Sequence, residues 1–268
     1  MRMMKKVLGT VTVLALSVSL LAGCGSTAVS PVSSTASTAA ESTTSSVVSE
    51  TTSAAADENA AAAAQLLNDL TGSYQELWPV ILADEYQQTW LDDCTALVGE
   101  ENAEAAFEKL SSMVTGDVYG EDAVEAYANG GGAYFCGFTN SLATLTFDGE
   151  TSTISGTDKD GNVLFSHTYH YIGMEPVHGL YEFESDDADS GEFTYFFLAP
   201  DTSAETYHIE FRYGSDAEAL SQYDAGEYAY WVASGISTDC DQTMIDNCIE
   251  LFCTCLLYTS PSPRDRTR

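Results

Sequence analysis

Residues 163–213 decide the fold, and they read VLFSHTYHYIGMEPVHGLYEFESDDADSGEFTYFFLAPDTSAETYHIEFRY. Short runs of aromatic and β-branched residues alternate here with groups of Gly, Pro, Asp and Ser. Runs of the first kind favour β-strands, and the polar groups between them favour turns. The segment therefore predicts four consecutive strands, at residues 163–172, 180–184, 192–198 and 207–213.

The same pattern continues upstream and predicts three more strands, at residues 133–138, 142–147 and 152–156. Asp160-Gly161 is a strong hairpin signal between the third of these and the strand that follows it. Helical spacing of apolar residues predicts helices within residues 76–113 and at residues 243–252. Seven successive strands joined by turns predict a mainly β fold with flanking helices, either an up-and-down antiparallel barrel or a sandwich.

Residues 65–254 have the composition and length of a single folded domain. The whole chain carries 41 acidic residues against 9 Lys and Arg, which gives a formal net charge of −32. Nucleic-acid binding depends on basic clusters, so nucleic acid is excluded as a partner. The sequence contains no nucleophile elbow, phosphate loop or zinc-protease helix motif, so we expect no enzyme activity.

The first residues predict export and a lipid anchor. Three basic residues within the first six positions precede an apolar run at residues 7–20, which is typical of a secretory signal. The LAGC motif of residues 21–24 resembles the bacterial lipobox, in which the cysteine sulfur receives a diacylglycerol. We therefore expect residues 1–23 to be a bacterial lipoprotein signal peptide. Cys24 would then hold the extracytoplasmic protein at the cell membrane.

Two low-complexity segments flank the domain. Residues 24–64 are rich in Ser, Thr and Ala and lack aromatic residues, which predicts a disordered tether. The end of the chain, YTSPSPRDRTR at residues 258–268, resembles translated sequencing-adapter read-through. We therefore expect residues 255–268 to be a non-native tail.

Six of the seven cysteines lie beyond Cys24. Disulfides persist outside the cytoplasm, and Cys94 could be joined to Cys136. Three other cysteines cluster within residues 248–255, so the sequence alone assigns no pairing.

Three segments in order carry a resemblance to a known family. They are NDLTGSYQELWP at residues 68–79, FLAPDTSAETYHIEF at residues 197–211 and YGSDAEAL at residues 213–220. Together they resemble the ZinT family of zinc-binding domains over most of residues 66–253. The resemblance implies a calycin-like (lipocalin-like) barrel in the cell envelope that works with a metal importer. It also implies a zinc ion held by three histidines, one before the Ala-Pro pair and two in a His-x-His after the loop.

This sequence departs from that histidine pattern. The first histidine position falls at Phe196 and the second at Thr206, so His208 alone of the three is retained. Residues i and i+2 of a strand point to one face, so Glu210 would lie beside His208. Zinc accepts carboxylate oxygen as well as imidazole nitrogen.

A further ligand has to come from elsewhere. His167 and His170 lie on the predicted strand 163–172, and their odd spacing directs them to opposite faces. Our hypothesis is a rebuilt Zn²⁺ site formed by His208, His170 and Glu210.

Three functions remain open from sequence, and one of them is a purely structural role in the cell envelope. Another is an extracytoplasmic, lipid-anchored zinc-binding protein of ZinT type that aids zinc uptake. The third is a calycin-like module that binds a small apolar ligand or an envelope protein and no metal. Tyr223, Tyr228, Tyr230 and Trp231 either pack between the barrel and the last helix or line a ligand cavity.

Overall fold

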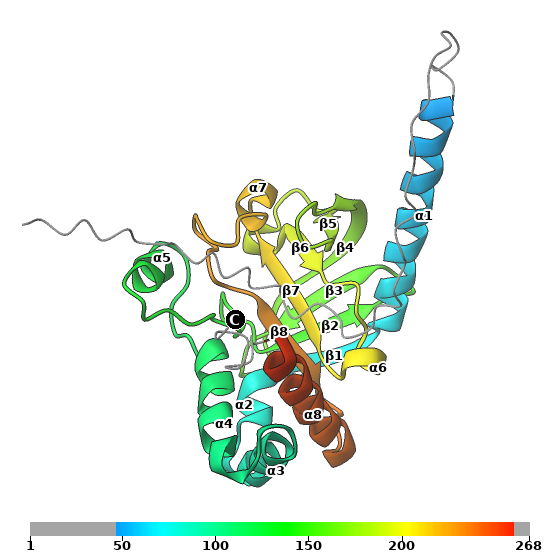
Figure 1. Ribbon diagram of the computed structural model, residues 1–268. Helices are drawn as coiled ribbons and strands as arrows, with labels where there is room; N and C mark the ends of the chain where they lie inside the picture. The colour runs from blue at the N-terminus through cyan, green and yellow to red at the C-terminus, as the bar shows by residue number, and fades with distance from the viewer. Residues whose placement is uncertain (1–46, 260–268) are drawn as a thin grey trace, which may run out of the picture.

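The computed structural model of the protein describes residues 47–259, and its centre is a closed barrel of eight antiparallel strands (Figure 1). The strands are β1 Gly72–Glu76, β2 Thr144–Asp148, β3 Thr153–Thr157, β4 Val163–Met174, β5 Tyr181–Ser185, β6 Tyr195–Leu198, β7 Ile209–Gly214 and β8 Ala233–Ser237. Each strand pairs with the next along the chain, and β8 returns to pair with β1. The expected calycin-like, up-and-down barrel is therefore confirmed.

Strands β1 and β8 close the barrel, and neither follows a strong strand pattern. Tyr74 of β1 lies opposite Leu145 of β2 on one side and Ser237 of β8 on the other. A strand paired on both sides has all its backbone groups satisfied, so polar or small residues are tolerated in it.

Aromatic side chains fill the barrel. Fully buried residues of the interior include Leu145, Phe147, Ile154, Phe183, Phe196 and Phe211. The rings of Phe196 and Tyr213 stack with centroids 5.4 Å apart. An eight-stranded barrel is just wide enough for its inward side chains to meet, so these rings form a packed core.

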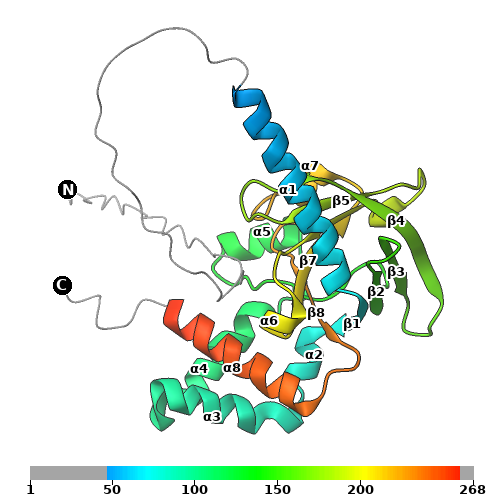
Figure 2. The same ribbon diagram turned by 90° about the vertical axis from the view of Figure 1, so that its right-hand side faces the viewer.

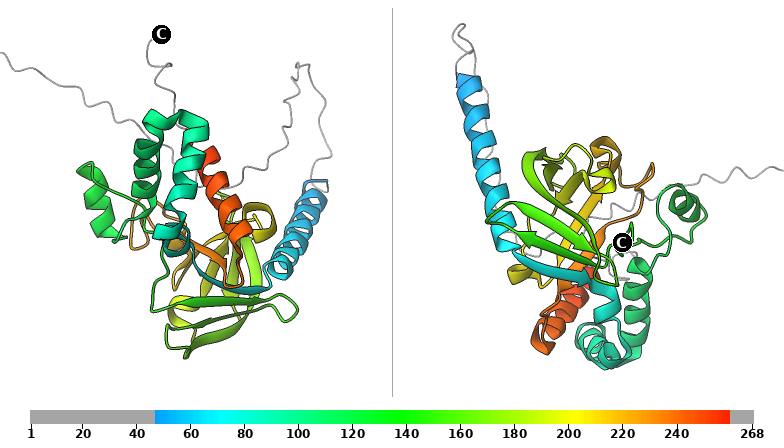
Figure 3. Two further views of the ribbon diagram at one scale, coloured as in Figure 1. Left: turned by 90° about the horizontal axis from the view of Figure 1, so that it is seen from below. Right: turned by 180° about the vertical axis from the view of Figure 1, so that it is seen from behind.

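A helical layer covers one end of the barrel, below it in Figure 1 and above it in the left view of Figure 3. It consists of α2 Leu77–Ile81, the 3₁₀ turn η1 Asp84–Tyr86, α3 Gln87–Val98, α4 Glu100–Val114 and α8 Gln242–Thr259. A second core of Trp78, Trp90, Leu110, Ile249 and Phe252 joins these helices to the barrel. The helices predicted within residues 76–113 and at residues 243–252 are confirmed.

Helix α1, Val47–Asp69, corrects part of the expected tether. Residues 47–64 are helical rather than disordered, because Ala has the highest helix propensity and this stretch is rich in it. The C-terminal part of α1 buries Ala63, Leu66 and Leu67 against the barrel, while its other end projects away from it (Figure 2). Residues 1–46, including the predicted signal peptide and Cys24, lie outside the described residues, as do residues 260–268 of the expected tail.

The strand predicted at residues 133–138 is wrong. This segment makes only isolated bridges, through Phe135 to Thr115 and Trp231. Because β1 and β8 close the barrel, no sheet edge remains for a further strand. The short helices α5 Glu121–Ala128, α6 Ser203–Thr206 and α7 Ala217–Leu220 and the 3₁₀ turn η2 Gly191–Phe193 lie in connections between the larger elements. Among residues 47–259, no helix is both long and apolar enough to cross a bilayer.

Candidate functional site

The site lies where the chain enters β7. Helix α6 begins with a capping box of Thr202 and Glu205 and ends at Tyr207, which has a left-handed φ of 63°. This reversal brings His208 directly before the first residue of β7. The hydroxyl of Thr206 donates a hydrogen bond of 3.0 Å to the carbonyl oxygen of His208, which fixes the backbone at the corner.

The ring of His208 is oriented by a second hydrogen bond. Its Nδ1 lies 2.6 Å from the carbonyl oxygen of Thr206. A carbonyl oxygen can only accept, so Nδ1 carries a hydrogen and donates it. The other ring nitrogen, Nε2, then faces Oε1 of Glu210 at a distance of 3.8 Å.

Both members of this pair are withdrawn from solvent. The exposed fraction is 3% for His208 and 9% for Glu210. The ring of Phe252, from α8, lies 4.8 Å from the imidazole and covers it. The placement of His208 and Glu210 on one face agrees with the alternation expected along a strand.

Helix α8 also contributes Cys248, which is fully buried and interacts with the imidazole of His208. Burial opposes the imidazolium, but the interactions of the ring with Cys248 and Glu210 outweigh burial and raise the pKa of His208 to about 10. Sequence reasoning missed Cys248, because nothing in the local pattern of residues 242–252 indicates which face of the helix meets β7.

Asp201 adds a carboxyl group on the same side of the barrel. It lies in the loop between β6 and α6. Burial and the negative charges of Glu210 and Glu205 raise its pKa, and the positive charge of His208 partly offsets them. The surroundings of His208 thus offer nitrogen, oxygen and sulfur donors, although in the described part of the chain no three His, Cys, Asp or Glu side chains already form a group that could hold a metal ion.

The structure does not bring His170 to this site. The strand register can be followed from His170 across the sheet. His170 of β4 is paired with Glu184 of β5, which is paired with Tyr195 of β6. Tyr195 in turn is paired with Gly214, the last residue of β7. His208 precedes the first residue of that strand, so two strands and the length of β7 separate the two histidines. The three-residue set predicted from sequence is therefore not assembled, because strand pairing places its members at opposite ends of the sheet.

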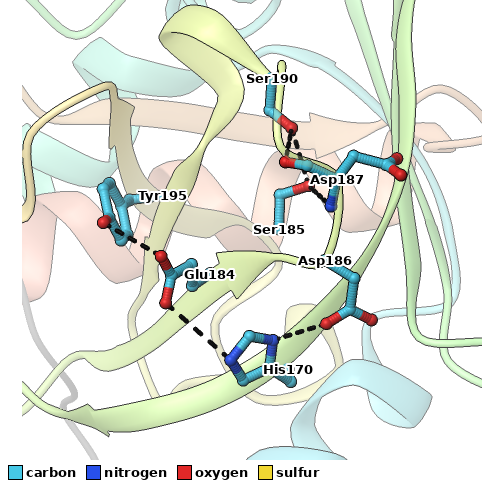
Figure 4. Close-up of polar contacts among 7 residues, drawn as sticks. All are labelled: His170, Glu184, Ser185, Asp186, Asp187, Ser190 and Tyr195. Carbon is cyan, nitrogen blue, oxygen red and sulfur yellow. Dashed lines mark hydrogen bonds and ion pairs between the residues drawn. The ribbon is translucent and has the colours of Figure 1, made fainter.

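His170 instead belongs to an outward-facing polar cluster (Figure 4). Its Nδ1 lies 2.7 Å from Oδ1 of Asp186, and its Nε2 lies 3.9 Å from Oε2 of Glu184. Its side chain is 52% exposed. His167 is on the opposite face of β4, as the odd spacing predicts, and pairs with Asp187 at 2.7 Å.

The remaining histidine, His178, takes part in a buried structural network. Its ring lies 3.8 Å from the ring of Tyr223 and 3.5 Å from Oε2 of the fully buried Glu175. The buried guanidinium of Arg212 sits over the same tyrosine ring at 4.2 Å. Arg212 also donates hydrogen bonds to the carbonyl oxygens of Leu220, Gln222 and Tyr228.

A separate cavity of about 310 Å³ lies between the helical layer and the barrel. Its lining is mostly apolar and includes Trp78, Leu82, Val114 and Phe135. The buried indole Nε1 of Trp78 makes no hydrogen bond.

No family model and no curated protein matches the chain. Solved structures are similar to it in fold. The Zn(II)-bound ZinT-like domain of Streptococcus pneumoniae AdcA is 16% identical with a TM-score of 0.44, and the match covers 69% of this chain and 89% of that domain. The Zn(II)-bound AdcA of Streptococcus pneumoniae is 15% identical with a TM-score of 0.41, over 68% of this chain and 34% of the larger protein. The chain thus spans about a third of the length of AdcA.

Proposed function

We propose that the protein is an extracytoplasmic, lipid-anchored zinc-binding protein whose ion is held at His208 and Glu210 and passed to a metal importer. One observation carries the metal proposal. The buried imidazole of His208 is locked through Nδ1 to the carbonyl oxygen of Thr206, and its Nε2 faces the carboxylate of Glu210.

This arrangement is the one that metal-binding histidines adopt. A ligating imidazole almost always donates its other ring N–H to a carbonyl or carboxylate group, which fixes the orientation of the ring. The Thr206 carbonyl supplies that partner here. The ring needs no rotation to present Nε2 to an ion.

The spacing of the two donor atoms also fits one ion. Two ligands of a tetrahedral zinc at ~2.0–2.2 Å lie ~3.3–3.5 Å apart. The observed 3.8 Å between Nε2 and Oε1 therefore needs a contraction of only a few tenths of an ångström. At pH 7 zinc would displace a proton from His208, whose pKa is raised to about 10.

The buried thiol of Cys248 is the third ligand in this proposal, and water completes the coordination. Cys, His and Glu are all zinc ligands, and zinc converts a coordinating thiol to the thiolate. The acidic surface, with a formal net charge of −32, raises the local concentration of cations around the domain.

Zinc titration of the purified protein against a chromophoric chelator tests the proposal. We expect one tight site in the native protein and its loss in His208→Ala. His170→Ala is the matched control, because His170 is an exposed histidine that makes carboxylate contacts away from the site. Equal zinc uptake by the native protein and His208→Ala would refute the assignment.

The cavity beside Trp78 supports a second candidate function, the binding of a small apolar molecule. Its volume of about 310 Å³ is at the lower end of ligand pockets, and its lining is mostly apolar. Binding of a fluorescent apolar probe that Leu82→Trp abolishes by filling the cavity would support this function. The result would be independent of zinc.

A further inference from the structure

Two buried cysteines, distant in sequence, meet between helices α3 and α8. Sγ of Cys94 lies 3.7 Å from Sγ of Cys253, and both residues are fully buried. The other buried thiols have different neighbours: Cys136 lies beside Trp78 and Ser234, and Cys248 beside His208. The pairing of Cys94 with Cys136 considered from sequence is therefore not the arrangement in the fold.

We propose that Cys94 and Cys253 form a disulfide bond when the chain folds in an oxidising compartment. A disulfide has an S–S distance of about 2.05 Å, so the sulfurs must approach by less than 2 Å. Small side-chain rotations of two cysteines on packed helices supply such a movement. The bond would join α3 to α8 across 159 residues of sequence.

The reaction is a thiol–disulfide exchange with a disulfide donor, either an envelope oxidoreductase or oxidised glutathione. The thiolate of one cysteine attacks the donor and releases one donor thiol, which leaves a mixed disulfide on the protein. The second cysteine then attacks that sulfur and releases the other donor thiol. Two protein S–H bonds and one donor disulfide are consumed, and one protein disulfide and two donor thiols are formed.

Burial determines when this exchange can occur. Desolvation raises the pKa of the Cys94 thiol. Desolvation, followed by the neighbouring Cys94, raises the pKa of the Cys253 thiol. The attacking species is the thiolate, so both groups react slowly once α3 and α8 are packed. The bond therefore forms during folding, before the helices close over the two sulfurs.

A covalent link at this position opposes a local repulsion. Asp93 on α3 faces Asp246 and Glu250 on α8, and burial, followed by these negative charges, raises the pKa of its carboxyl group. Asp93 precedes Cys94 directly, and Glu250 lies one helical turn before Cys253. The disulfide would hold together two helix surfaces that their charges push apart.

The same link would fix the cover of the His208 site. Helix α8 supplies both Phe252, whose ring lies 4.8 Å from the imidazole, and Cys248. The proposed bond rests on the export included in the proposed function but not on zinc, so the redox test and the zinc titration can fail separately.

Peptide mapping of protein refolded in a glutathione redox buffer with a metal chelator tests the bond. Cleavage after glutamate releases residues 86–100, with Cys94, and residues 251–268, with Cys253 and Cys255. We expect these two peptides to be linked under non-reducing conditions and separated by a reducing agent. The cut after Glu250 removes Cys248 from the second peptide, and fragmentation of the linked pair distinguishes Cys253 from Cys255.

Thermal unfolding provides a second readout. A disulfide closing so long a loop stabilises the fold mainly by restricting the unfolded chain, so reduction should lower the Tm by about 5–10 °C. Cys94→Ser should unfold at the reduced protein's Tm and show no change on reduction, whereas Cys240→Ser should behave like the native protein. Free thiols at both Cys94 and Cys253 after oxidative refolding, or a bond to Cys255 instead, would overturn the proposal.

Discussion

Nε2 of His208 lies 3.8 Å from Oε1 of Glu210, and both groups are almost completely shielded from solvent. The ring's other nitrogen is held by the Thr206 carbonyl, so the contact is directed rather than accidental. A buried imidazole and carboxylate in this arrangement support either an ion pair or a shared metal ion. In an ion pair and in a shared metal site alike, replacing one of the two side chains should impair the role of the other.

Glu210→Gln should destabilise the metal-free protein. The carboxylate offsets the positive charge of the buried His208, and removing one partner of a buried pair leaves the other without compensation. We expect the free energy of unfolding to fall by about 3 kcal/mol, measured by urea denaturation. Glu218→Gln, on the exposed face of α7, should change it by less than about 0.5 kcal/mol. Equal stability of the two variants would exclude a stabilising pair.

If the thiol is the third ligand, Cys248→Ala should weaken zinc binding about tenfold or more. The variant loses one protein ligand and the negative charge of its thiolate. Cys240→Ala is the matched control, since Cys240 lies just before α8 and is partly exposed. Competition with a chelator gives both affinities. Unchanged affinity in Cys248→Ala would leave only His208 and Glu210 as protein ligands.

Asp93→Asn should stabilise the protein. Burial, followed by the charges of Glu250, Asp246 and Asp92, raises the pKa of Asp93 in the folded state. The folded protein therefore binds this proton more tightly than the unfolded chain, and stability rises as the pH falls through the folded-state pKa. We expect the variant to melt about 1–3 °C higher at pH 7, with the difference shrinking towards pH 4. A constant difference across this range would contradict the electrostatic cause.

Arg212→Lys should strongly destabilise the barrel despite keeping the charge. The guanidinium donates to three carbonyl oxygens and stacks over Tyr223, which an ammonium group cannot reproduce. We expect a loss of about 2–4 kcal/mol in the free energy of unfolding. Lys159→Arg, in the exposed turn between β3 and β4, should have little effect.

Cys24→Ser should abolish lipid attachment. The prediction rests on the LAGC motif at residues 21–24 alone. Cells expressing the native protein should incorporate a labelled fatty acid into it and retain it in the membrane fraction. The variant should incorporate no label, and incorporation into both would point to another acylation site.

Local patterns determined most of the strands. Residues 163–172 and 207–213 alternate side chains with a period of two, and that period alone put His208 and Glu210 on one face. The hairpin predicted from Asp160-Gly161 is confirmed, because Gly161 adopts a φ of 80° and Asp158 accepts hydrogen bonds from the backbone of Asp160 and Asn162. Such features depend on neighbouring residues and can therefore be inferred from them.

Contacts between distant segments depended on the tertiary structure. β1 and β8 have weak strand patterns and are strands because each supplies an edge for the other to close the barrel. Strand order placed His170 at the far end of the sheet from His208, although both occupy predicted strands.

The sequence by itself determined a barrel-forming series of strands, the flanking helices and the shared face of His208 and Glu210. Only the tertiary structure decided that Cys248 accompanies His208 and that Cys94 meets Cys253. The physical reason is that backbone periodicity is a property of adjacent residues. Which helix face packs against which strand is decided instead by apolar burial summed over the whole chain.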